Sequence, residues 1–132
     1  MSQTTCQVRV RYAETDGMGV VYYGNYLTWF EVGRADLFRQ LGQSYREIEE
    51  NEMVHLLVVE AHCRYHKPAR YDDLVDIVTR ASRPSRARVQ FDYQLSRAED
   101  GVLLASGTTL HVAVGRDWRP CRLPRKLQDL LR

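Results

Sequence analysis

Apolar and polar positions follow two different periods at the start of the chain. Residues 6–13 alternate, with Cys6, Val8, Val10 and Tyr12 on one face, which predicts a half-buried strand. Residues 25–41 repeat with a helical period and predict a helix that begins after an N-cap at Asn25 and ends before a C′ glycine at Gly42. The apolar stripe of this helix is broad and consists of Tyr26, Leu27, Phe30, Leu37, Phe38 and Leu41.

Two positions on the helix interrupt the apolar pattern. Gly33 lies at the edge of the stripe, where the missing side chain allows another element to approach closely. Arg34 lies inside the stripe and is expected to pair with Glu31 one turn earlier, as a structural contact. After the helix, Ser44-Tyr-Arg-Glu47 is a capping box that predicts a short second helix ending at about Glu50.

The second half of the chain returns to a period of two. It predicts strands over 56–65, 73–82, 86–97 and 102–115, with a hairpin turn at Glu99-Asp-Gly101 and a short helix over 125–131 opened by Pro124. One long apolar helix followed by a run of antiparallel strands is typical of an α+β fold. We therefore expect residues 1–132 to form one domain, with the sheet wrapped around the long helix.

Composition and charge narrow the class of protein. The chain has 132 residues, 44% hydrophobic and 27% charged, with a formal net charge of +2, which argues against a dedicated nucleic-acid binder. No apolar run is long enough for a membrane span, and no secretory signal is visible at the N-terminus. The three cysteines Cys6, Cys63 and Cys121 are odd in number and widely spaced, so we expect reduced thiols and a cytoplasmic protein.

The arginines are locally concentrated although the net charge is small. They cluster at Arg80, Arg83, Arg86 and Arg88, and again at Arg116, Arg119, Arg122 and Arg125. A cluster of this kind is either a solvated face or a site for a phosphorylated ligand, because arginine prefers planar bidentate partners. The sequence alone leaves both interpretations open.

The stretch YAETDGMGVVYYGNY, residues 12–26, combines carboxylates and glycines immediately before the long helix. It lacks the third glycine of a dinucleotide fingerprint, since Tyr22 occupies that position. Asp16 and the unpaired N–H groups of a helix N-terminus would suffice for acyl transfer to water, and an Asx-type turn at Asp16 is the structural alternative. The set Glu60, His62 and His66 on one strand face is a weaker hypothesis for a metal site.

Residues 9–42 closely resemble the N-terminal signature of the 4-hydroxybenzoyl-CoA thioesterase/YbgC-type acyl-CoA thioesterases. The signature comprises a tyrosine, an acid-rich turn, Gly-Val-Val-Tyr and then Asn-Tyr at the start of a long helix, here RYAETDGMGVVYYGNY. The stretch 65–73, YHKPARYDD, is similar to the strand-turn-strand junction of this family. The resemblance implies a hotdog fold, and an enzyme that hydrolyses a small or aromatic acyl-CoA.

The resemblance also implies roles for individual residues. Asp16 corresponds to the carboxylate that attacks the thioester carbonyl or activates water. The backbone N–H at Tyr23, with Gly24 beside it, corresponds to the oxyanion hole, and Tyr12 to a tyrosine near the acid. Tyr26 is expected among the substrate-binding residues. The YbgC branch usually has histidine where this chain has Tyr23, and a backbone donor does not depend on that side chain. Thr15 could orient Asp16. Glu14 is expected to face solvent, because the turn breaks the strand alternation that would place it on the face of Tyr12, and its register is left open.

Further implications concern ligands and partners. Residues Arg83, Ser85, Arg86 and Arg88 match the region that binds the phosphates of coenzyme A in such enzymes. The resemblance implies a homodimer with active sites at the interface, often doubled to a homotetramer, and no cofactor besides the coenzyme A of the substrate. A non-catalytic module that binds acyl-CoA or acyl carrier protein is the alternative function, and a hotdog dehydratase is a weaker one because no histidine lies near the long helix.

Overall fold

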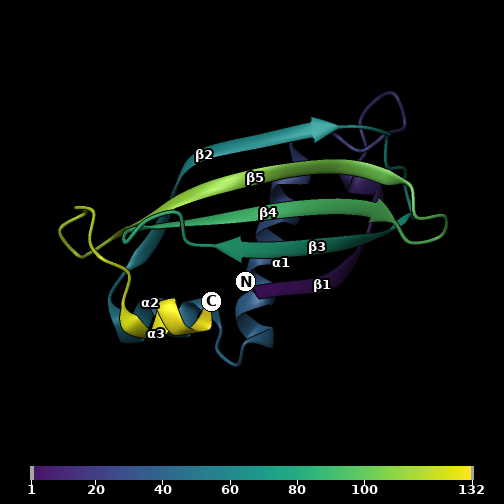
Figure 1. Ribbon diagram of the computed structural model, residues 1–132. Coiled ribbons are helices and arrows are strands. Elements are labelled where there is room, and N and C mark those ends of the chain that lie inside the picture. The colour runs from purple at the N-terminus through teal and green to yellow at the C-terminus, as the bar shows by residue number, and fades with distance from the viewer. Residues whose placement is uncertain (1, 132) are drawn as a thin grey trace.

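The computed structural model describes residues 2–131 and contains one antiparallel sheet with helices packed against it (Figure 1). The sheet has five strands in the order β1-β3-β4-β5-β2, so β1 and β2 form its edges. In chain order the elements are β1 (Ser2–Arg9), the 3-10 turn η1 (Tyr12–Glu14), α1 (Asn25–Gln40), α2 (Tyr45–Glu52), β2 (His55–Tyr65), β3 (Leu74–Ser82), β4 (Arg88–Arg97), β5 (Leu103–Val114) and α3 (Arg125–Leu130). The predicted α+β hotdog fold is confirmed.

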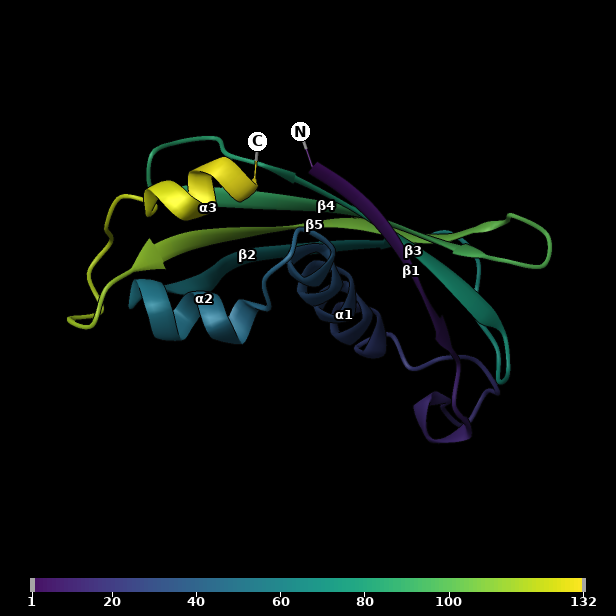
Figure 2. The same ribbon diagram turned by 90° about the horizontal axis from the view of Figure 1, so that it is seen from below.

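Helix α1 and helix α2 lie on the same side of the sheet, and the sheet bends around α1 (Figure 2). The apolar stripe of α1 supplies the core, with Trp29 and Phe30 buried together with Leu37 and Phe38. Gly33 faces β3 so closely that an added Cβ would meet the Ile77 side chain at 2.8 Å and the Thr79 hydroxyl closer still. The predicted close approach at Gly33 is therefore confirmed.

The first strand lies earlier than the predicted range of 6–13. It runs from Ser2 to Arg9, and Tyr12 begins η1 instead of ending the strand. The N–H of Thr15 is donated to the carbonyl of Tyr12, and the N–H of Arg11 to the carboxylate of Glu14. These local bonds turn the chain where the alternating pattern predicted a longer ladder.

Both ends of α1 show how the glycine-rich stretch sets the helix. The N-cap is Gly24 and not Asn25, because the Asn25 amide side chain donates to the carbonyl of Glu14 at 2.9 Å. At the other end Gly42 has φ +103°, which confirms its predicted C′ position. The capping box of Ser44 and Glu47 is also confirmed, although α2 continues to Glu52.

The remaining predicted strands and turns appear within two residues of their expected bounds. The hairpin between β4 and β5 has Gly101 at φ +73°, and Pro124 is the N-cap of α3. The predicted ion pair between Glu31 and Arg34 is absent from the ion pairs of residues 2–131; Arg34 Nη1 donates instead to the Tyr93 hydroxyl at 3.3 Å. No helix in the described range is long and apolar enough to cross a membrane.

Candidate active site

The glycine turn after η1 holds Asp16 in a defined position. A bridge between Thr15 and Val21 closes the turn, and the Asp16 N–H is donated to the Val20 carbonyl at 2.8 Å. The Asp16 carboxylate accepts the N–H of Met18 at 2.8 Å and that of Val20 at 3.4 Å, both through Oδ1. The Asx-type turn is therefore present, and it leaves Oδ2 without a hydrogen bond to any residue in the described part of the chain.

The entrance to α1 offers two unused donors close to this turn. Asn25 and Leu27 donate their N–H groups to the carbonyls of Tyr22 and Gly24, as the first helical turn requires. Within residues 2–131, no hydrogen bond uses the N–H of Tyr23 or of Gly24. Free N–H groups at a helix N-terminus carry a partial positive charge and can bind an oxyanion.

A shallow depression of about 320 Å³ brings the acid and the helix entrance together. Asp16 and Tyr23 both line it, while Gly24 and Tyr12 do not. Apolar and aromatic side chains form most of the surface, with one histidine and one lysine at the side of the β2–β3 connection. The other lining residues are Met18, Val20, Val21, Tyr26, Tyr65, His66, Lys67 and Pro68.

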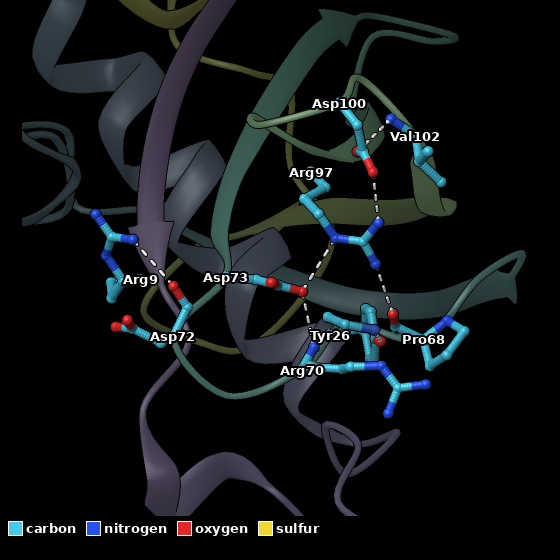
Figure 3. Close-up of polar contacts among 10 residues, drawn as sticks. Arg9, Tyr26, Pro68, Arg70, Asp72, Asp73, Arg97, Asp100 and Val102 are labelled. Carbon is cyan, nitrogen blue, oxygen red and sulfur yellow. Dashed lines mark hydrogen bonds and ion pairs between the residues drawn. The ribbon is translucent and has the colours of Figure 1, made fainter.

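The β2–β3 connection forms one wall of the depression and is held in place by Arg97 (Figure 3). The Arg97 guanidinium lies 3.1 Å from Asp73 and 2.9 Å from Asp100, and it donates to the Pro68 carbonyl at 3.1 Å. Hydrogen bonds to Asp100 and then to Asp73 raise the pKa of Arg97, so the guanidinium stays charged. The predicted strand-turn-strand junction at 65–73 thus serves as a rigid wall.

Two tyrosines connect this wall to the helix entrance. Tyr26, a predicted substrate-binding residue, is buried, and its hydroxyl accepts the N–H of Ala69 at 3.2 Å. The Tyr65 hydroxyl donates to the carbonyl of Tyr23 at 3.0 Å, and burial raises the pKa of Tyr65 to about 12. Both phenols are neutral at physiological pH. Tyr65 fixes the peptide at Tyr23, and Tyr26 fixes the wall at Ala69.

Glu14 was expected to face solvent, and this expectation is wrong, because the residue is buried. Its carboxylate accepts the N–H of Arg11 at 2.8 Å and the indole N–H of Trp29 at 3.1 Å, while its carbonyl accepts the N–H of Tyr22. Glu14 therefore ties η1 to α1. Only the glutamate half of a capping box is formed, because the Arg11 side chain cannot accept a hydrogen bond, so the sequence carried no capping-box signal here.

Two other expectations around Asp16 differ from the structure. The Thr15 hydroxyl donates to the carbonyl of Tyr12 at 2.7 Å and makes no hydrogen bond to Asp16. The Tyr12 side chain is 76% exposed and packs edge-on against Tyr71 at 5.6 Å between ring centroids. The ring thus lies outside the depression that Asp16 lines.

The predicted phosphate-binding residues lie at the far end of the sheet. Arg83, Ser85 and Arg86 share a second depression with Arg122 and Gln128, which we call the arginine cleft, whereas Arg88 does not line it. Figure 1 shows the β3–β4 connection, which carries Arg83, Ser85 and Arg86, at the opposite end of β3 from the β2–β3 connection. The 9 residues of β3 at about 3.3 Å each span about 30 Å, so one chain does not bring the two regions together.

The structure does not support the weaker hypothesis of a metal site at Glu60, His62 and His66. The register of β2 shifts between Val58 and Glu60, and His66 lies beyond the end of the strand. The His66 ring forms a hydrogen bond with the Ser106 hydroxyl at 2.9 Å. Across residues 2–131, no group of three or more His, Cys, Asp or Glu side chains is arranged to hold a metal ion.

Comparison with known proteins identifies the family. Residues 10–131 match the Thioesterase-like superfamily. The chain belongs to this family. The putative acyl-CoA thioesterase YneP of Bacillus subtilis is 32% identical to it over 124 residues, which cover 93% of this chain and 88% of the relative.

Solved structures of the family have the same fold. The DHNA-CoA thioesterase from Staphylococcus aureus has a TM-score of 0.88 and 36% identity, covering 98% of this chain and 86% of its own. The 1,4-dihydroxy-2-naphthoyl-CoA thioesterase from Synechocystis has a TM-score of 0.91 and 27% identity, covering 98% and 95%. The predicted membership of an acyl-CoA thioesterase family is thereby confirmed.

Proposed function

We propose that this chain hydrolyses a small or aromatic acyl-CoA thioester to a free acid and coenzyme A, with Asp16 as nucleophile or general base. The observation that carries the proposal is that two residues line one depression at the entrance of α1. They are Asp16, whose Oδ2 accepts no hydrogen bond from the described residues, and Tyr23, whose N–H is unused among them. Family membership supports the same reaction class.

The chemistry requires few groups. In the general-base form, Asp16 takes a proton from water as the water oxygen attacks the thioester carbonyl. The N–H groups of Tyr23 and Gly24 stabilise the oxyanion, which then collapses and expels the thiolate of coenzyme A. In the nucleophilic form, the Asp16 carboxylate attacks the carbonyl carbon and expels the thiolate of coenzyme A, and water then cleaves the resulting mixed anhydride to the free acid and Asp16. Neither form assigns a cofactor, since coenzyme A belongs to the substrate.

The aromatic character of the depression supports the proposed acyl group. Tyr23 is 64% exposed and Tyr65 47% exposed, and their rings meet edge-on with centroids 6.5 Å apart. Exposed aromatic faces of this kind favour a flat ring over a long flexible chain. Relatives that act on 1,4-dihydroxy-2-naphthoyl-CoA are consistent with this choice.

We further propose that two chains pair through their β2 edges, because this pairing explains the position of the arginine cleft. Strand β2 is an edge strand with Val58 and Val59 about half exposed. A two-fold axis makes the paired β2 strands antiparallel, which reverses the partner's sheet end for end. The arginine cleft of the partner then lies at the same end of the joint sheet as Asp16, where it can bind the phosphates of coenzyme A.

The free thiols support a proposed location in the cytoplasm. All three cysteines are free, and burial, followed by the charge of Asp36, raises the pKa of Cys6 to about 11. Unpaired thiols of this kind favour the proposed cytoplasmic location.

Sedimentation analysis tests the proposed pairing of two chains through their β2 edges and separates a homodimer from a homotetramer.

The proposal is tested by thiol release from a panel of short-chain, long-chain and aromatic acyl-CoAs. Asp16→Asn should lower the rate by roughly 10²–10⁴-fold, which is the usual contribution of a positioned acid or base. Asp117→Asn is the matched control, because Asp117 lies on the loop after β5 and, among residues 2–131, accepts only the N–H of Arg119 at 3.1 Å. Equal rates for Asp16→Asn and wild type would refute the assignment of Asp16.

The arginine cleft also supports a second candidate, a non-catalytic module that binds acyl-CoA or acyl carrier protein. Three arginines, Arg83, Arg86 and Arg122, line the cleft and suit an anionic partner whether or not hydrolysis occurs. Binding of acyl-CoA without thiol release would favour the module, and steady release would exclude it.

A further inference from the structure

The loop after β5 places a tryptophan where the backbone favours glycine. The N–H of Gly115 donates to the Arg119 carbonyl at 3.1 Å, and the N–H of Trp118 donates to the Gly115 carbonyl at 3.0 Å. These bonds define a hairpin loop of three residues, whose last position takes the left-handed conformation that suits glycine. Here that position is Trp118, with φ +61°. A bulky residue in this conformation strains the backbone, and strain of this kind clusters at functional sites.

The strained position does not serve to bury the indole ring. Trp118 is 64% exposed, and its one ring contact among residues 2–131 is with His55, at 5.6 Å between centroids and 8° between ring planes. The His55 ring is itself held in place, because its Nδ1 lies 2.6 Å from the Glu49 carboxylate. His55 therefore supports one face of the indole and leaves the opposite face open to a further flat ring.

The chain continues from this loop directly into the arginine cleft. The N–H of Leu123 donates to the Arg86 carbonyl at 2.8 Å, which fixes the preceding residue, Arg122, against the β3–β4 connection. Figure 1 shows the loop after β5 and the β3–β4 connection at the same end of the sheet. Trp118 and Arg122 are four positions apart, which limits the separation of their Cα atoms to about 14 Å.

The arginine cleft provides positive charge next to the open indole face. Arg83, Arg86 and Arg122 line the cleft, and no acidic residue is among its lining residues. Within residues 2–131, none of these three guanidinium groups takes part in an ion pair. An exposed aromatic face beside arginines suits a ligand that carries both a base and phosphate groups, because the base stacks and the phosphates pair with guanidinium groups.

We propose that the adenine ring of coenzyme A stacks on the open face of Trp118, while the 3′-phosphate of the same nucleotide binds in the arginine cleft. The base and the 3′-phosphate are attached to one ribose, so the two contacts must lie close together, as Trp118 and Arg122 do. The inference rests on the proposed function, because that function makes coenzyme A the ligand. It adds a contact for the base to the contacts proposed for the phosphates.

Tryptophan fluorescence of the full chain, titrated with adenosine 3′,5′-bisphosphate, tests the proposal without hydrolysis. The chain has two tryptophans and Trp29 is buried, so quenching by a stacked base reports on Trp118. Inorganic pyrophosphate, which has the charge without the base, should cause no quenching. Absence of quenching by the nucleotide would overturn the proposal even where thiol release is normal. Quenching by the nucleotide in a chain that releases no thiol would support the proposal and refute the proposed hydrolysis alone.

Trp118→Gly separates binding from folding, because glycine suits the left-handed position and only the ring is lost. Nucleotide binding, measured by calorimetry, should weaken roughly 5- to 100-fold, as expected for the loss of one base stack. The midpoint of urea unfolding should stay the same or rise. Trp118→Phe keeps a ring and should bind more tightly than Trp118→Gly. Unchanged binding in Trp118→Gly, with lower stability or altered sedimentation, would assign Trp118 to the fold or to a contact between copies and overturn the proposal.

A second pair of variants tests the phosphate contact. Arg122→Gln should weaken binding of adenosine 3′,5′-bisphosphate about tenfold or more, because a charge-assisted contact is lost. Saturating nucleotide should still quench Trp118 in this variant. Arg39→Gln, which changes an exposed arginine on α1, is the matched control and should leave binding unchanged. Equal binding by Arg122→Gln and wild type would overturn the assignment of the 3′-phosphate to the arginine cleft.

Discussion

Two neighbouring turns carry one carboxylate each and use it in opposite ways. In η1, Glu14 is 7% exposed, and both of its carboxylate oxygens accept hydrogen bonds from Arg11 and Trp29. In the glycine turn, Asp16 is half-buried, and only Oδ1 is bonded, to backbone N–H groups of its own turn. The comparison shows that a carboxylate remains available for chemistry when local backbone groups fix its position without using both oxygens.

The largest expected effect separates the two acids by activity. Asp16→Asn keeps the size of the side chain and an acceptor oxygen for Met18, so the turn and the free energy of unfolding should change little. Its rate of thiol release should nevertheless fall by roughly 10²–10⁴-fold. Thiol release and urea unfolding of the same preparation provide the two measurements. A large loss of stability in Asp16→Asn would mean that Asp16, like Glu14, is mainly structural.

Measurements over a range of pH show where the protonation of His111 affects the free energy of unfolding. The variants of Asp16 and Glu14 can then be compared outside that range. Burial, followed by the charge of Arg34, lowers the pKa of His111 to about 4 in the folded state, against 6.5 in the unfolded chain. Because the unfolded chain binds the proton first, stability should fall as the pH drops from about 6.5 to about 4, by about 3 kcal/mol in total. Above that window His111 has no effect on the pH dependence.

The measurement for His111 is urea unfolding at pH 7 and at pH 4.5. His111→Gln should reduce the difference in unfolding free energy between the two pH values. An unchanged difference would assign the acid sensitivity to groups other than His111. Variants of Asp16 and Glu14 are therefore best compared above pH 7.

Substitution of Glu14 should change stability, in contrast to substitution of Asp16, which should change the rate of thiol release. Glu14→Gln keeps the shape of the side chain but removes its charge and leaves one of its two donors, Arg11 N–H or Trp29 Nε1–H, facing an amide NH₂ group. The free energy of unfolding should fall by about 1–3 kcal/mol. The double variant with Trp29→Phe should lose less than the sum of the two single variants. Additive losses would show that Glu14 and Trp29 do not act together.

The smallest effect is expected at Tyr12. Its ring packs on Tyr71 and lies outside the depression at Asp16. Tyr12→Phe retains that ring contact, so thiol release should stay within about twofold of wild type, a difference below 0.5 kcal/mol. A larger loss would restore the role near the acid that the family resemblance implies for Tyr12.

Much of this fold was predictable because it depends on local signals. The period of two over 56–65, 73–82, 86–97 and 102–115 predicted four strands within two residues of their bounds, and Gly42 and Pro124 marked helix ends. The N-cap was misplaced by one residue because the Asn25 side chain bonds to Glu14, 11 positions earlier in the chain. Contacts at that separation leave no periodic signal.

In the candidate site too, features that depend on local sequence were predictable, and features that depend on distant contacts were not. The chain itself determined that a carboxylate and glycines precede a long amphipathic helix, because turn chemistry and hydrophobic period act over a few residues. Only the tertiary structure decided that Glu14 is buried and Asp16 is not, and that Arg34 donates to Tyr93 instead of pairing with Glu31. It also decided that the arginine cleft lies about 30 Å of strand away from Asp16. Burial and pairing depend on which elements pack together, and that packing joins residues far apart in the chain.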